Sequence, residues 1–532
     1  MTGNEHGEYD VCYVCISDMH LGEEDSLLTN IEGGNLDTSK PSEVMVKLVE
    51  CLKEIIGENK IKEKKPTLIL NGDILELALT KTNIAAMTFD RFLELILKKD
   101  EPLFDRVVYI PGNHDHHIWE LARESQYTDY ICRHPNEDLP FPWHKTPLCL
   151  PPLPDNYSSN GWGYIRPGET GDVTSDVEDK RIGSEFLDRL IERHSFSKYE
   201  GIELDDRIRI EIAYPNLGLF SEDNKKCVLI HHGHFVEVIY RLMSILKAAA
   251  LGIDRDMPLD VQMLESENFA WIEFFWSTMG RSGDAGEISE TCYEHLGNKE
   301  HMEKLTSEIA NNLSNKYGVI SPLAKKIEAA VIKDILNLIH RCLVSDWVKC
   351  QEKGSKGENT VRGILLYLNT VWNQILEEQK GNAPSELTFI FGHTHKPFDM
   401  CIPLTGILIE GLTTDLNIYN TGGWVVDEAV CNKNKGASIV LLDKELNHVE
   451  VHMYKETSCP EMSCVKVTSR KTDGNPFYDT IKSNIENWEK ENKENENKEE
   501  ENKENPWNEF SNIINYEIEL RRECIKCRLQ GL

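Results

Sequence analysis

Short apolar runs recur along the chain, and five of them stop abruptly at a cluster of polar residues. Runs of β-branched and aromatic residues of this length predict buried strands. Residues 107–110 (Val-Val-Tyr-Ile) show the pattern clearly, because Pro111 and Gly112 end the run and an amide, an imidazole and a carboxylate follow. Ligands of open α/β sheets bind beyond strand ends, so the pattern predicts an active site in these loops. The other four runs are residues 11–17, 67–70, 226–230 and 386–391.

Helical spacing of apolar residues fills the gaps between the first three runs. It covers residues 42–56, with Ser42 as the expected cap, and residues 84–97. The first 125 residues therefore follow a β-α-β-α-β order. This order favours an α/β fold with a parallel or mixed sheet and helices on its faces.

Two long segments interrupt the core pattern. The first is rich in Pro, Gly, Ser, Asp and Asn, with a helix predicted over residues 181–194 and a strand over 203–213. The second reads as mostly helical, with helices over 261–279, 288–316, 322–342 and 360–379, and we interpret it as a cap inserted between core strands.

The last part of the chain returns to strands and then loses its pattern. Strands are predicted over 406–410, 416–420, 438–442 and 448–453, a solvated linker or frayed helix over 487–505, and a helix over 510–529. We divide the chain into a first core part (1–125), an irregular insertion (126–225), a central core strand and helix (226–250), a helical cap insertion (251–384), a final core part (385–470), and a charged linker with a C-terminal helix (471–532).

Composition narrows the class of partner. The chain has 532 residues, too many for one ordinary core, and a net charge of −32. Such a surface repels nucleic acid and anionic lipid, which argues against a nucleic-acid partner. A neutral substrate, or a small phosphorylated substrate complexed with metal, is repelled less. The first ten residues carry no secretory signal and the 15 cysteines are scattered, so we expect a cytoplasmic protein with reduced thiols.

The longest apolar stretch, residues 235–253, is a poor membrane span because it carries Glu237, Arg241 and Lys247. It predicts a buried amphipathic helix, and peripheral contact with a bilayer is the alternative. Residues 116–123 are also expected to be helical, with His116 and His117 exposed or behind the metal ligands.

The polar clusters at the strand ends have the composition of a metal site. An Asp and a His two residues apart in an extended segment project to the same side, as Asp18 and His20 do. Three histidines around Gly233 favour a metal or phosphate role, because packed neutral imidazoles leave nitrogens unpaired. Oxygen and imidazole ligands without thiolate suit Mn, Fe, Zn, Ni or Co. Seven plausible ligands fit two ions that share a carboxylate and a bridging water, as in hydrolysis of a phosphate ester or anhydride.

In order, the five blocks resemble those of the calcineurin-like metallophosphoesterases: Asp18-Met19-His20, Gly72-Asp73, Gly112-Asn113-His114-Asp115, His232-Gly233-His234 and Gly392-His393-Thr394-His395. The resemblance implies two facing sheets flanked by helices, a four-layer α-β-β-α sandwich, here with a mostly helical inserted cap. It also implies two divalent metal ions, one held by Asp18, His20 and His395, the other by Asn113, His232 and His393, with Asp73 as the bridge. His114 would lie over the phosphate and assist the leaving group, and Asp115 would tune its protonation. In the fourth block His232 best matches the family ligand, and His231 and His234 are its rivals.

The branch of the family and the substrate stay open. The block Gly72–Glu76 and the block Gly112–Asp115 argue against the protein Ser/Thr phosphatase branch, and the net charge argues against a nuclease-type phosphodiesterase. The first block, as Ser17-Asp18-Met19-His20-Leu21-Gly22, and the second block, Gly72–Glu76, are similar to the UDP-diacylglucosamine pyrophosphatase branch, from which the long helical insert departs. A non-catalytic metal-binding scaffold that acts through its cap is the alternative from another class. Substrate contacts are expected from His234, Arg241 and Arg281, with surface or structural pairing as the other interpretation of the two arginines.

Overall fold

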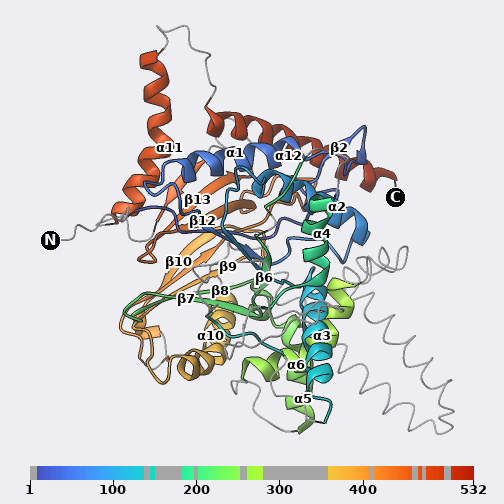
Figure 1. Ribbon diagram of the computed structural model, residues 1–532, viewed down its shortest axis with the longest axis vertical. Coiled ribbons are helices and arrows are strands. Elements are labelled where there is room, and N and C mark those ends of the chain that lie inside the picture. The colour runs from blue at the N-terminus through green and yellow to red at the C-terminus, as the bar shows by residue number, and fades with distance from the viewer. Residues whose placement is uncertain are drawn as a thin grey trace.

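The protein is a mixed α/β molecule with parallel and antiparallel pairing, shown in Figure 1 as a computed structural model. The structure describes residues 9–136, 144–149, 182–196, 202–205, 207–251, 260–278, 358–406, 409, 411–457, 465–469, 475–495 and 505–531.

A seven-stranded sheet contains the first three predicted strands. Its order is β14-β13-β12-β1-β4-β5-β6, in which the four strands from β1 to β6 are parallel and the other three pair antiparallel. The strands are β1 (Tyr13–Ile16), β4 (Thr67–Asn71), β5 (Arg106–Ile110), β6 (Ile210–Ile212), β12 (Gly436–Leu442), β13 (His448–Lys455) and β14 (Lys466–Thr468).

A five-stranded sheet contains the two later runs, in the order β10-β11-β9-β8-β7. The three central strands are parallel, and the two edge strands run antiparallel to them. One buried cluster takes Ile69 and Val108 from the first sheet and Ile230 and Ile390 from the second, so the two sheets pack face to face. The strands are β7 (Asn216–Phe220), β8 (Lys226–His231), β9 (Glu386–Phe391), β10 (Phe398–Ile402) and β11 (Leu416–Asn420).

Helices cover the outer face of the seven-stranded sheet. In α1 (Glu43–Gly57) the hydroxyl of Ser42 accepts a hydrogen bond from Met45 N at 3.1 Å, which caps the helix, and the apolar stripe faces the core. In Figure 1, α1 and α12 lie above this sheet. A large buried apolar cluster joins these helices to the seven-stranded sheet. Its helices are α1, α2 (Thr82–Ile96), α3 (His116–Arg133), α4 (Glu185–Phe196), α11 (Pro476–Asn495) and α12 (Pro506–Gly531).

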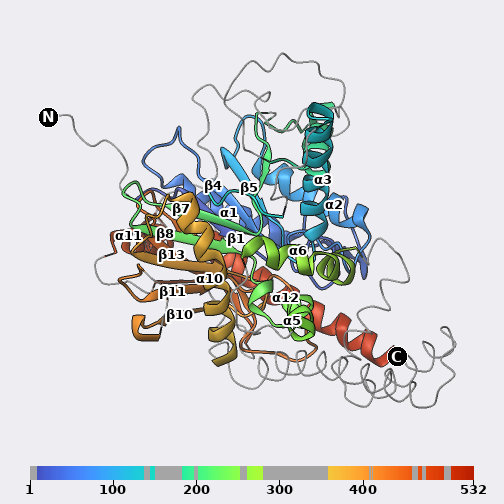
Figure 2. The same ribbon diagram turned by 90° about the horizontal axis from the view of Figure 1, so that it is seen from below.

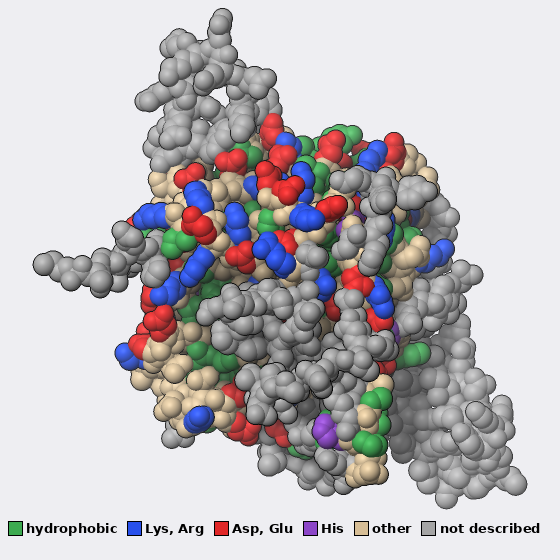
Figure 3. All heavy atoms as spheres, in the orientation of Figure 1, with side chains coloured by type: hydrophobic (Ala, Val, Ile, Leu, Met, Phe, Trp, Pro, Cys, Tyr) green, Lys and Arg blue, Asp and Glu red, His purple; other side chains and the backbone are tan. Residues whose placement is uncertain are grey.

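A second set of helices packs on the other sheet. Seen from below in Figure 2, α10 (Glu358–Glu378) lies in front of the five-stranded sheet. The cluster there also includes α6 (Val261–Ile272), the short turn η1 (His234–Val236) and Leu242 at the start of α5 (Leu242–Leu251). No helix among the described residues is long and apolar enough to cross a bilayer. Acidic and basic side chains are intermingled on the face shown in Figure 3.

Several predicted elements differ from the structure. The helix expected in the apolar stretch 235–253 is confirmed only from Leu242 to Leu251, as α5, because the chain first forms η1 and a second short turn η2 (Ile239–Arg241). Glu237 between the turns is extended, with φ −85° and ψ 143°. The strand expected over 406–410 is also wrong where it is described, since Gly406 ends a 3-10 turn. The helices expected over 288–316 and 322–342 lie outside the described residues, and the division of the chain into core and insertions stays a prediction.

Candidate metal centre

Five loops meet at the ends of the five predicted strands. The carboxyl ends of the parallel strands β1, β4 and β5 lie at one edge of their sheet, and those of β8 and β9 lie at one edge of the other. Backbone hydrogen bonds tie the first two loops together, from Asp18 N to Gly72 O and from His20 N to Asp73 O, both at 2.9 Å. His393 N donates to Asp18 Oδ1 at 2.8 Å, which joins the two sheets.

The predicted metal ligands fall into two groups. In the first, atoms of Asp18, His20 and His395 lie within 4.8 Å of one another, and in the second so do atoms of Asp73, His232 and His393. Asp73 lies between the groups, with Oδ2 at 3.0 Å from His232 Nε2 and 3.9 Å from His20 Nε2.

Asn113 completes the set, because its Oδ1 lies 3.0 Å from His232 Nε2. All seven side chains therefore converge on one place.

The backbone of these loops is strained. A non-glycine residue with positive φ is uncommon and costs of order 1–3 kcal/mol, and such residues cluster at functional sites. The loops also approach one another closely. At Gly392, a Cβ would lie 2.0 Å from Asp18 Oδ2, so this position has room only for glycine. Five of the seven convergent residues have positive φ: Asp18 (49°), His20 (45°), Asp73 (51°), His393 (69°) and His395 (52°).

Two imidazole nitrogens face each other in the first group, with His20 Nε2 and His395 Nε2 3.1 Å apart. The other nitrogen of each ring meets a carboxylate, Glu76 at 2.8 Å from His20 Nδ1 and Asp427 at 3.0 Å from His395 Nδ1. In neutral rings the protons therefore lie on Nδ1 and two Nε2 lone pairs point at one another. A proton added to His20 would bridge the pair, and a divalent cation could take its place, since metal binding displaces ligand protons.

Charge is concentrated in the second group as well. Burial opposes ionisation of Asp73, but the neighbouring His232 and His114 outweigh it and hold the pKa of Asp73 well below its usual range. Burial also opposes charge on His232, and the carboxylate of Asp73 raises the pKa of His232 to about 9. These buried imidazole and carboxylate donors fit divalent metals of the Mn-to-Zn series.

His114 lies beside both groups and pairs with a residue that we had not singled out. Its Nδ1 lies 2.8 Å from Glu76 Oε2, and its backbone N–H donates to Asp73 Oδ1 at 2.7 Å. Burial lowers the pKa of His114, yet the Glu76 carboxylate outweighs burial and raises it. Glu76 thus orients His20 and His114 together. The sequence signal was available, because Glu76 ends the block that begins at Gly72.

Asp115 is turned away from His114. Its carboxylate accepts hydrogen bonds from Gly112 N at 2.6 Å, Ile74 N at 2.7 Å and the Tyr109 hydroxyl. We expected Asp115 to tune the protonation of His114, but the structure puts Glu76 in that place and uses Asp115 to fix the loop backbone.

The histidines around Gly233 separate into different environments. His232 joins the second group, whereas His231 Nδ1 accepts from Gly233 N at 2.8 Å. His234 is fully buried, and both its nitrogens lack a hydrogen-bond partner among the described residues. Its ring centroid lies 5.7 Å from that of His232. Burial and the nearby His231 hold the pKa of His234 well below its usual range.

The other expected substrate contacts are less defined. Arg241 is half-buried at the end of η2 and belongs to neither ligand group, and Arg281 lies outside the described residues. Residues missed by the sequence reasoning include Glu237, whose Oε2 lies 3.3 Å from His393 Nε2, and Asp427, which also pairs with Lys435.

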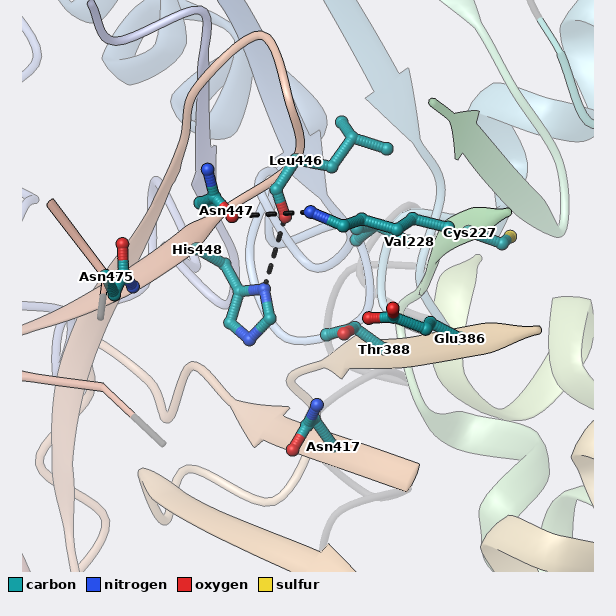
Figure 4. A pocket seen from close by; sticks show the side chains of 10 residues that line it. Cys227, Val228, Glu386, Thr388, Asn417, Leu446, Asn447, His448 and Asn475 are labelled. Atoms are coloured by element: carbon teal, nitrogen blue, oxygen red, sulfur yellow. Dashed lines mark hydrogen bonds between the residues drawn. The ribbon is translucent and has the colours of Figure 1, made fainter. Parts of the chain in front are cut away.

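A cavity of about 90 Å³ lies away from this centre (Figure 4). Its lining includes Lys226 and Glu386, which begin β8 and β9, whereas His232 and His393 follow the opposite ends of those strands. Lys226 Nζ donates to Asn447 Oδ1 at 3.4 Å. The cavity is therefore separate from the metal centre.

Comparison with protein families agrees with the geometry. Residues 13–250 match the family model described as calcineurin-like phosphoesterase. No curated protein and no solved structure matches the chain. The family and the clustered His, Asp and Glu side chains support a metal-dependent phosphoesterase in general terms. The match, which spans residues 13–250, supports membership of the calcineurin-like metallophosphoesterase superfamily.

Proposed function

We propose that the protein binds two divalent metal ions and hydrolyses an ester or anhydride bond of a small phosphorylated substrate. Asp18, His20 and His395 would hold one ion and Asn113, His232 and His393 the other, with Asp73 shared. The observation that carries the proposal is Asp73, whose Oδ2 lies within 4 Å of a histidine from each group. A bound metal pair supplies an activated water and neutralises phosphate charge.

The chain's own residues would position and protonate the substrate. His114 lies beside both groups, and the neighbouring Glu76 raises its pKa, which favours the protonated ring that could hydrogen-bond to a phosphate oxygen or give a proton to the leaving group. Glu76 keeps that ring oriented through its contact at 2.8 Å. The surrounding Glu23, Glu237 and Asp427 make the approach acidic, which disfavours a nucleic-acid backbone and favours a compact substrate.

The wider architecture is part of the same proposal. The packing of helices on both outer faces supports a four-layer α-β-β-α sandwich. Residues 251–384 would form the inserted cap over it. A cytoplasmic location remains a prediction.

Metal analysis combined with ester hydrolysis tests the function. Protein loaded with Mn²⁺ should hold close to two ions per chain and cleave p-nitrophenyl phosphate or bis-(p-nitrophenyl) phosphate. A screen of phosphorylated metabolites then identifies the bond that is cleaved fastest. Bound metal without hydrolysis of any ester or anhydride would favour the scaffold, and preference for the bis-ester and for DNA would favour the nuclease.

A further inference from the structure

The first turn of α3 is tied to a segment from outside the core. Helix α3 begins at His116, directly after Asn113, His114 and Asp115. His116 is fully buried, with Nε2 at 2.8 Å from Glu265 Oε1 in α6 and Nδ1 at 2.9 Å from Glu273 Oε2 in the π-helical turn η3 (Glu273–Ser277). Both ring nitrogens are therefore held by carboxylates. Of the two expectations for His116 and His117, exposure is wrong, since both are buried.

The neighbouring residue repeats the arrangement. His117 Nδ1 lies 2.6 Å from Glu273 Oε1, and its backbone N–H donates to the Ser277 hydroxyl at 2.7 Å. The first N–H groups of a helix have no partner within the helix, and Asp115, which precedes α3, gives no side-chain cap because its carboxylate holds the preceding loop. Ser277 therefore caps α3 from another part of the chain.

The hydrogen bonds of His116 to Glu265 and Glu273 restrict movement of the first turn of α3. Hydrogen bonds between an imidazolium and a carboxylate are charge-assisted, and here they are shielded from water. Glu265 is itself fixed, since its other oxygen accepts from the Tyr214 hydroxyl at 2.9 Å and its side chain is fully buried. Glu273 and Ser277 lie four residues apart, so both face α3.

We propose that His116, Glu265 and Glu273 form a brace that fixes the position of the loop carrying Asn113 and His114, and so sets the rate of turnover. His116 is a positioning residue, two positions from His114 and in contact with neither ligand group. The inference rests on the proposed function and extends it. It assigns the segment around α6 and η3 a role in aligning His114, where misplacement by about 1 Å can cost 100-fold in rate.

The test replaces His116 and compares it with a matched control. His116→Gln keeps a buried polar side chain but cannot reach both carboxylates. His194→Gln is the control, because His194 is also a buried histidine on a carboxylate, Asp90 at 2.5 Å, between α2 and α4. We expect kcat of His116→Gln to fall by about 10- to 100-fold, with KM and metal content close to those of the unaltered protein. The control should keep its kcat.

A conservative change separates positioning from folding. Glu265→Gln still accepts a hydrogen bond from His116 and should retain most of the turnover, whereas Glu265→Ala should lose as much as His116→Gln. An unchanged kcat in His116→Gln, or an equal loss in His194→Gln, would overturn the brace.

Hydrogen exchange gives a readout that needs no substrate. The amides of residues 113–118 should exchange faster in His116→Gln than in His194→Gln. If the unaltered protein cleaves no ester, the proposed function fails while this measurement still judges the brace. Unchanged exchange at residues 113–118 would overturn the brace even in an active enzyme.

Discussion

Two loops of the proposed metal centre are held by helices that are distant in sequence, one through its backbone and the other through a side chain. The loop after β1 is clamped by α12, where the buried Arg521 donates to the backbone oxygens of Ser26 at 3.3 Å and Thr29 at 2.7 Å. The loop after β5 is held by α6 and η3 through side-chain charges on His116.

The two supports differ in what they fix. Arg521 holds the backbone of the loop after β1. Ser26 in this loop donates its hydroxyl to Met19 O at 2.7 Å, and Met19 lies between Asp18 and His20 in the sequence. His116 acts two residues from the proposed acid, His114. The comparison teaches that one support should govern metal binding and the other turnover.

Replacing Asp73, the ligand that both metal groups are proposed to share, should reduce metal binding and turnover together. Asp73→Asn keeps the shape but weakens both metal groups, so both metal and turnover should be lost. Replacing residues behind metal ligands costs about 10- to 100-fold in affinity, so loss of a bridging ligand should exceed about 100-fold. Mass spectrometry of the metal that stays with the protein after gel filtration measures the metal content of the variant. Retention of both ions would contradict the role of Asp73.

Removing the imidazole beside the centre should separate chemistry from metal. His114→Ala is expected to lower kcat by about 10²- to 10⁴-fold, the usual contribution of a general acid. Metal content should stay near two ions per chain, because His114 belongs to neither proposed ligand set. A parallel loss of metal would assign His114 to the metal site instead.

Breaking the first support should affect metal more than turnover. Arg521→Met retains the apolar stem and removes both donors to the loop after β1. We expect metal affinity to fall by about 10- to 100-fold, with kcat restored at saturating metal. Exposed Lys526 in the same helix provides the control, as Lys526→Met. If added metal did not restore the kcat of Arg521→Met, the proposed difference between Arg521 and His116 would be wrong.

The second support should depend on pH, whereas the first should not. Burial lowers the pKa of His116, but Glu265 outweighs it and raises the pKa to about 9 from an ordinary 6.5. Because the pKa of His116 is higher in the folded protein than in the unfolded chain, protonated His116 stabilises the fold fully below pH 6.5. This stabilisation is lost as the pH rises towards 9. Over this window the free energy of unfolding should fall by up to about 3 kcal/mol more than in His116→Gln. Urea unfolding at several pH values measures the difference, and parallel curves would contradict it.

The five core strands and the polar residues at their ends could be predicted from the sequence because both are local signals. The assignment of seven of these residues as metal ligands comes from the family resemblance and stays a prediction. Each buried run stops at residues that must turn, so polar side chains fall at strand ends whatever the rest of the chain does. The face-to-face packing of the two sheets then brings together residues as distant as His20, after β1, and His395, after β9.

Other features depend on contacts that no local pattern encodes. The sequence places Glu76 at the end of the block that begins at Gly72, but its contact with His114 depends on two loops that lie side by side. The predicted helix after His234 breaks at Glu237, which is extended and reaches His393. Edge strands such as β10 and β14 are short, and their apolar residues resemble those of ordinary loops. The long α11 carries so many charges that its sequence resembles a linker.

The distance along the chain between His20 and His395 sets an order of events during synthesis. The two rings lie 3.1 Å apart but are separated by 375 residues. At about 5–20 residues per second, a ribosome takes roughly 20 to 75 seconds to travel from one to the other. The first proposed metal group therefore cannot be assembled on the nascent N-terminal part, and an ion held there would be acquired late, after residue 395 has emerged.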